Sequence, residues 1–151
     1  MSKNQSKPDF YSGIPWVYVT GEQARNLPKG RLNPTLWLIV GYFILVAALG
    51  FWLAFYYRAG LGTALVYGVL PLLTGLGLAF RIPWSVVMAM IVTGLSAYGL
   101  IRGLGGNSVL ALLQTIANMG ILFYLVDGDR PNLIYRHRYR KYSVEKEEVS
   151  D

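Results

Sequence analysis

The stretch from Pro34 to Val126 constrains this chain more than any other feature, because it carries only three charges and neither a carboxylate nor a histidine. The charges are Arg58, Arg81 and Arg102, and they divide the stretch into four apolar runs. An α-helix rises ~1.5 Å per residue, so about 20 residues cross a hydrocarbon layer ~30 Å thick. Each run has close to that length. The sequence therefore predicts an all-α integral membrane protein with four transmembrane helices arranged as two helical hairpins.

The predicted spans cover residues 34–57, 61–80, 82–101 and 107–126. Residues 1–33 form a polar amino-terminal segment, and residues 127–151 form a tail that is first basic and aromatic and then acidic. The first apolar run is longer than the ~7–15 residues of a signal-peptide core, so we expect it to remain as an anchor. The chain is too short for a separate soluble domain.

The flanking charges predict the orientation of the spans. Five Lys and Arg residues precede the first span and six follow the last, whereas the two outer loops contain one arginine each. Positive charges favour the cytoplasmic side of a membrane. Both termini are therefore predicted to be cytoplasmic, and a bacterial inner membrane is the expected location.

Two carboxamides, Gln114 and Asn118, are the most polar side chains deep within a predicted span. Their spacing of four residues places them on one face of a helix. A carboxamide without a partner in hydrocarbon costs several kcal/mol, so we expect both to face protein. They either hold helices together or line a polar cavity. Pro71 either kinks its span or acts as a hinge.

Small residues recur at every fourth position in the second and third spans. Such faces let helix backbones approach closely in lipid, either within one chain or between copies. The positions are Gly60, Ala64 and Gly68, followed by Ser85, Ala89, Thr93 and Ala97.

The amino-terminal segment contains an aromatic patch with Trp16 and Tyr18, followed by Thr20 and Gln23. A threonine with a glutamine three residues later predicts a helix start with a capping box. We expect a short interfacial helix that Pro28 ends. The two aromatic rings suit the membrane interface, packing on the protein's own loops, or a partner's surface.

The carboxyl-terminal tail interleaves cations with aromatic rings just beyond the fourth span. Such a segment is an ordinary topology signal, a site for anionic lipid headgroups, or a docking site for a protein. We expect docking to lipid or to other membrane subunits, a second copy of the chain included, and no nucleic-acid partner. Together with Trp16 and Tyr18, the residues expected in this docking role are Arg136, Arg138, Tyr139, Arg140 and Lys141.

No motif in the sequence predicts a catalytic, cofactor or metal site. The chain has no cysteine and a single histidine. Asp127-Gly128-Asp129 has the spacing of a cation loop, but no glutamate follows at the position that a calcium loop requires, so turn chemistry explains it better. Enzymatic work would need a general base that the spans lack.

These observations favour a non-enzymatic accessory subunit or assembly factor of a larger membrane complex, which docks through its cytoplasmic ends. The alternative is a small transporter or channel subunit for a neutral or polar solute. The absence of intramembrane carboxylates disfavours coupling to protons or sodium.

Overall fold

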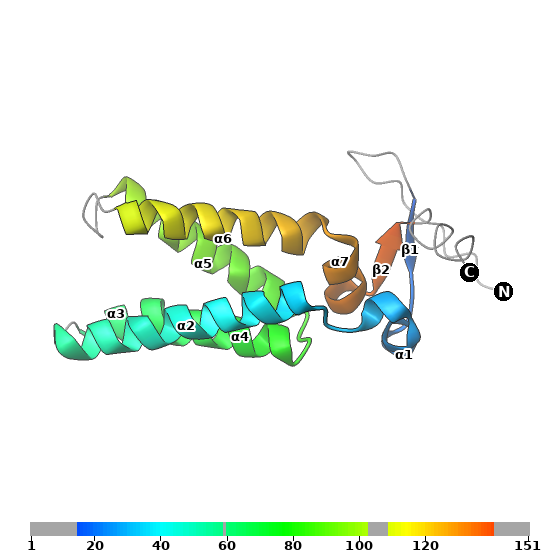
Figure 1. Ribbon diagram of the computed structural model, residues 1–151, viewed down its shortest axis with the longest axis horizontal. Coiled ribbons are helices and arrows are strands. Elements are labelled where there is room, and N and C mark those ends of the chain that lie inside the picture. Colours follow the sequence, from blue (N-terminus) through cyan, green and yellow to red (C-terminus); the bar gives the residue numbers. More distant parts are fainter. Residues whose placement is uncertain (1–14, 59, 103–108, 141–151) are drawn as a thin grey trace. The chain divides into compact units, whose positions relative to one another are not determined.

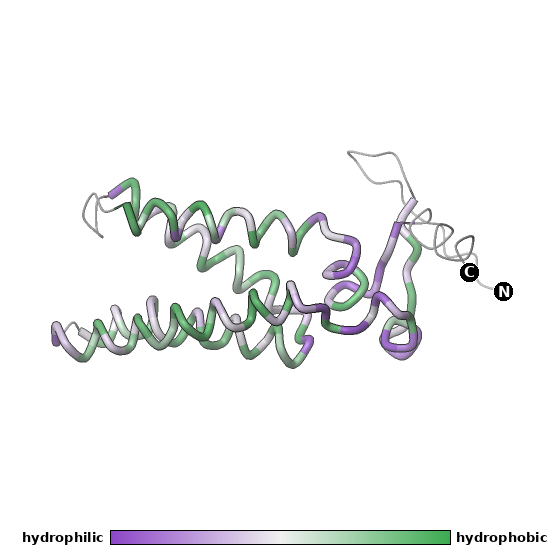
Figure 2. The backbone as a smooth tube through the Cα atoms, viewed as in Figure 1, coloured by the Kyte–Doolittle hydropathy of each residue, from purple (hydrophilic) through white to green (hydrophobic). Residues whose placement is uncertain are grey.

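The computed structural model describes residues 15–58, 60–102 and 109–140. They fall into two compact units (Figure 1). The helix unit is Asn33–Val126, and the flank unit combines Met1–Leu32 with Asp127–Asp151. In Figure 2 the helices of the helix unit are largely hydrophobic, whereas the flank unit is richer in hydrophilic residues. Lys141 and the acidic tail lie outside the described residues.

Among the described residues, four helices are long and apolar enough to cross a membrane, which confirms the mainly helical architecture and agrees with a multi-pass membrane protein. The first is α2, Pro34–Tyr56. The second runs over Leu61–Ala79 and comprises α3 (Leu61–Ala64), a π-helical turn (Leu65–Val69) and α4 (Leu70–Ala79). The third is α5, Trp84–Ile101, and the fourth is α6, Val109–Asp127.

The helix boundaries follow from local chemistry. Asn33 caps α2, because its side-chain oxygen accepts a 3.0 Å hydrogen bond from the Leu36 amide, and Pro34 occupies the first turn, where a missing N–H costs nothing. At the end of α4, the Ile82 amide donates to the Gly77 carbonyl across 2.8 Å. Arg81 there adopts a left-handed conformation, φ 59°, which is more often a glycine's position.

Glycines set how closely the first two spans pack. A Cβ on Gly50 of α2 would lie 1.9 Å from the Tyr67 carbonyl oxygen, and one on Gly75 of α4 would lie 3.3 Å from the Val40 carbonyl oxygen. A methyl group at Gly50 would overlap that oxygen, and one at Gly75 would fit only if its neighbours moved by a few tenths of an ångström. Gly60, which the sequence placed on the packing face, has no atom within 4 Å of its would-be Cβ, so this part of the expectation is wrong.

The π-helical turn lies directly before Pro71. Proline has no N–H, so it cannot donate to the carbonyl of Tyr67 four residues earlier. Around this gap the helix widens, and the Leu70 amide donates to the Leu65 carbonyl five residues back. The Tyr67 carbonyl, to which Pro71 cannot donate, is the group that a Cβ on Gly50 would meet. The irregular turn of the second span therefore packs against Gly50 in the first span.

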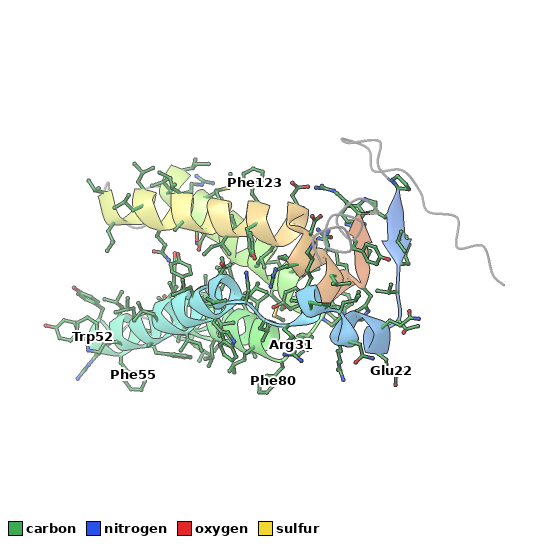
Figure 3. All side chains as sticks on the ribbon, turned by 45° about the vertical axis from the view of Figure 1, so that its right-hand side comes forward. Glu22, Arg31, Trp52, Phe55, Phe80 and Phe123 are labelled. Carbon is green, nitrogen blue, oxygen red and sulfur yellow. The ribbon has the colours of Figure 1, made fainter. Side chains whose placement is uncertain are left out.

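The third span buries its small face. Ser85, Ala89 and Thr93 are buried, as expected for residues four apart on one helix face, and Ala97 is half-buried. Ser85 of α5 packs 3.0 Å from the Cβ position of Gly77 on α4. Large apolar side chains of the other spans lie on the outside: Figure 3 shows Phe55 of α2, Phe80 at the end of α4 and Phe123 of α6 projecting outward, and all three are exposed. In a membrane, such side chains face lipid.

The flank unit contains two strands that the sequence did not predict. Strand β1 (Trp16–Tyr18) pairs antiparallel with β2 (Arg138–Arg140), so segments from opposite ends of the chain form one ribbon. Its helices are α1 (Gly21–Asn26), a 3-10 turn (Pro28–Gly30) and α7 (Asp129–Arg136). The predicted capping box is confirmed: Gln23 N donates to Thr20 Oγ1, and Thr20 N donates to Gln23 Oε1.

Candidate functional site

The β1–β2 ribbon brings the two predicted docking segments together. Trp16 lies opposite Arg140, and Tyr18 lies opposite Arg138. Because side chains alternate along a strand, these four residues share one face of the ribbon, and Val17 and Tyr139 share the other. The sequence analysis expected a docking role for both segments, at lipid or at a partner, but did not predict their pairing. We call the residues Trp16, Asn132, Arg136, Arg138 and Arg140 the arginine cluster.

Trp16 is the apolar centre of the arginine cluster. Its side chain is buried, and the guanidinium carbons of Arg138 and Arg140 lie 4.4 Å and 5.1 Å from the centroid of its ring. A cation over the face of an indole is attracted by the ring's quadrupole, and the attraction grows as water is removed. Trp16 therefore provides an aromatic face within the flank unit over which both guanidinium groups lie. Tyr18, in contrast, is exposed.

Arg140 is engaged inside the flank unit. Its side chain is 15% exposed and forms an ion pair with Asp127, and its Nη1 lies 3.9 Å from Asp129 Oδ1. These contacts connect β2 to Asp127, the last residue of α6, and to Asp129, the first residue of α7. The Asp-Gly-Asp segment thus serves as a turn whose carboxylates hold an arginine.

Arg136 and Arg138 converge on a single neutral acceptor. Arg138 Nε donates to Asn132 Oδ1 across 3.1 Å, and Arg136 Nη1 approaches the same oxygen at 3.5 Å. Asn132 is buried and its amide nitrogen donates to the Gly128 carbonyl at 2.9 Å, which fixes the direction of its oxygen. Burial, with a contribution from the charge on Arg138, lowers the pKa of Arg136 below its usual value.

The remaining predicted docking residues lie in different surroundings. Tyr139 is half-buried on the ribbon face opposite Trp16, and Lys141 lies outside the described residues. Tyr135, on α7 directly before Arg136, is buried and so is not available to a ligand.

Asn118 is the centre of a polar contact between three helices. Its Oδ1 accepts a 2.8 Å hydrogen bond from the Tyr42 hydroxyl of α2, and its Nδ2 donates to Ser96 Oγ of α5 at 2.8 Å. Thr93 of α5 also donates to its backbone carbonyl at 3.4 Å. Gln114 is half-buried one turn earlier. Within the part of the chain that the structure describes, no hydrogen bond joins its side chain to another residue.

Sequence reasoning missed the acceptors of the arginine cluster and the partners of Asn118. Asn132 follows Gly128 by four residues, a spacing that lets a helical side chain bond the preceding turn, but no local signal links it to Arg138. Tyr42 and Ser96 are separated from Asn118 by 76 and 22 residues, so only the fold joins them.

Comparisons with known proteins yielded no match to a family model, to a curated protein or to a solved structure. Among the described residues, no group of three or more His, Cys, Asp or Glu side chains is placed to hold a metal ion.

Proposed function

We propose that this chain is a non-enzymatic accessory subunit or assembly factor of a larger membrane complex, inserted as four spans with both ends in the cytoplasm. The observation that carries the proposal is the flank unit. A chain with only a topology signal at each end needs no folded structure there. Here both ends pair in one ribbon and build a defined surface.

The charge of the flank unit suits docking to an acidic surface. Its described residues include seven Lys and Arg against three Asp and Glu. Arg25 and Arg31 are exposed, whereas Arg140 is used internally. Charges exposed at a surface steer association more than they fix affinity. We therefore propose that a partner subunit approaches the flank unit with an acidic cytoplasmic face.

The pairing of the strands also supports the proposed topology. Four helices long enough to cross a membrane lie between β1 and β2, and an even number of crossings returns the chain to the side on which it started. Two segments that pair in one ribbon must lie on the same side. The positive-inside rule then favours the cytoplasm of a bacterial inner membrane.

The helix unit offers a second surface for assembly. Within α6, Asn118 and Leu125 are the buried residues, whereas α2, α4 and α5 each bury more of their length. The uncovered face of α6 meets either lipid or another helix, from a different subunit or from a second copy of the chain.

The proposal is tested by affinity purification in a mild detergent from the native membrane, comparing the wild type with an R25Q/R31Q variant. We expect a stoichiometric partner with the wild type and a salt-sensitive loss of that partner in the variant. The matched control is R58Q/R102Q, which removes two charges from the opposite loops. A monodisperse chain with no partner from native membranes contradicts the proposal.

The second candidate, a small transporter or channel subunit, is favoured by the polar contact of Tyr42, Asn118 and Ser96 between three helices. Its test is uptake of neutral polar solutes into liposomes that contain the purified chain. Uptake that exceeds empty liposomes and falls in an N118L variant supports this candidate over the first.

A further inference from the structure

Arg136 and Arg138 differ from Arg140 in what balances their charge. Arg140 lies against two carboxylates, Asp127 and Asp129. Arg136 and Arg138 approach the neutral oxygen of Asn132 instead. Among the residues that the structure describes, no carboxylate lies within ion-pair distance of either guanidinium. Within the described ranges, two like charges are thus held together with no carboxylate beside them.

Contacts within the flank unit fix the positions of Arg136 and Arg138. Asn132 is held by Gly128, and the Arg138 guanidinium is stacked on the Trp16 ring and bonded through Nε. Both arginine side chains are half-buried, so their mutual repulsion is screened less than on an open surface. Charged groups in such a position are stabilised by a counter-ion. Paired guanidinium groups match the oxygens of a phosphate, because each presents several N–H donors in one plane.

We propose that Arg136 and Arg138 bind the phosphate of an anionic phospholipid headgroup. The lipid is favoured over a free phosphate by the chain's connectivity. Helix α7 starts two residues after α6 ends, and its eight residues span ~12 Å, about one and a half times the screening length of ~8 Å at physiological salt. The site is therefore tethered near the surface of the membrane that α6 crosses. This binding needs no protein partner and so goes beyond the proposed function.

The test measures lipid association with the full chain, purified in mild detergent, by native mass spectrometry during titration with phosphatidylglycerol or phosphatidylcholine. We expect wild-type chain to retain phosphatidylglycerol in preference to phosphatidylcholine. An R136Q/R138Q variant should bind phosphatidylglycerol roughly 10- to 30-fold more weakly, since it removes the charged N–H donors that the fixed cluster directs at the phosphate.

The matched control is R25Q/R31Q, which removes two exposed charges from the same unit. We expect its affinity for phosphatidylglycerol to change by less than about threefold, because diffuse surface charge lacks the fixed geometry of the cluster. An equal loss in both variants overturns the proposal and leaves a non-specific basic surface. Unchanged binding in R136Q/R138Q also overturns it.

Adding competitors to the lipid titration distinguishes a lipid headgroup from a free phosphate or an acidic protein. If inorganic phosphate at millimolar concentration binds the chain without lipid and displaces phosphatidylglycerol, the site takes a free anion and the assignment to lipid is wrong. If an acidic peptide displaces the lipid and binds more tightly, the occupant is a protein. Displacement by neither supports the lipid.

An R136K/R138K variant decides the case in which R136Q/R138Q does not fold. It keeps both charges but loses the planar donors, so we expect a loss of at least threefold in phosphatidylglycerol affinity with an unchanged circular dichroism spectrum. Lysine variants that bind as well as the wild type would show that charge alone suffices, which contradicts a built phosphate site.

Discussion

The hydroxyl of Tyr42 on α2 donates a 2.8 Å hydrogen bond to Oδ1 of Asn118 on α6. The same carboxamide donates to Ser96 on α5, so one side chain joins three helices. Asn118 contributes much of the packing of α6, because Leu125 is the other buried residue among the described residues of this helix. Apolar contact alone gives little net association between helices in lipid, where the tails are as apolar as leucine. Hydrogen bonds and close packing therefore decide where α6 lies.

We predict that Asn118→Leu lowers the free energy of unfolding in detergent by about 1–2 kcal/mol, because it removes two side-chain hydrogen bonds and leaves Tyr42 and Ser96 without those partners. Gln114→Leu on the same helix is the control, and its effect should stay below about 0.5 kcal/mol. Thermal or denaturant unfolding of the purified chain measures both. Equal losses in the two variants would contradict the central role of Asn118.

A second prediction concerns the contact of Gly50 with the Tyr67 carbonyl. Gly50→Ala places a methyl group where the carbonyl oxygen lies, so we expect a loss of about 1–3 kcal/mol from overpacking. Gly41→Ala is the control on the same helix, since nothing lies within 4 Å of its would-be Cβ. It should be neutral or slightly stabilising, because alanine favours helix. Similar melting temperatures for both variants would argue against tight packing at Gly50.

The sequence predicted the spans because their signal is local. Pro34 at a first turn, the capping box of Thr20 and Gln23, and long runs without charge each follow from neighbouring residues. The irregular second span was only partly predictable. Pro71 indicates a lost hydrogen bond, but a π-helical turn before it and a matching glycine on α2 depend on packing between helices.

The flank unit could not be predicted from the sequence, because its structure also depends on contacts between residues that are distant in the chain. Strands of three residues have almost no pattern of their own, and Trp16 and Arg140 are far apart in the chain. The alternation of arginine with histidine and tyrosine in residues 136–140 is compatible with a strand, but the sequence analysis interpreted it as a surface tail. Pairing places Arg140 against Asp127 and leaves Arg136 and Arg138 as the candidate site.

The third prediction tests the ion pair between Arg140 and Asp127 by a double-mutant cycle with Arg140→Gln and Asp127→Asn. Asp127 is 74% exposed, so solvent screens the pair and we expect a coupling of about 0.5–1 kcal/mol. Arg140→Gln alone should cost more than Asp127→Asn, because it also loses Asp129 and the Trp16 ring. Hydrogen exchange of the Val19 amide, which donates to the His137 carbonyl, reports on the ribbon in the intact chain. Additive effects would show that the two residues do not interact.

The last prediction tests both the strand pairing and the topology with engineered cysteines, because the chain has none of its own. Val17 lies opposite Tyr139 in the ribbon. Paired residues in an antiparallel ladder have Cα atoms about 4.5–5.5 Å apart, within the range that a disulfide bridges. We therefore expect V17C/Y139C to form an intramolecular disulfide in membranes under mild oxidation, whereas each single variant should stay monomeric or dimerise only weakly.

After reduction, a membrane-impermeant thiol reagent should label both cysteines in inverted vesicles and neither in intact cells, because five cations precede the first span and six follow the last. Labelling of one cysteine from each side would contradict an even number of crossings. Labelling of both from outside would reverse the orientation while leaving the ribbon intact. A disulfide that forms only between chains would instead assign the pairing of β1 and β2 to two copies of the protein.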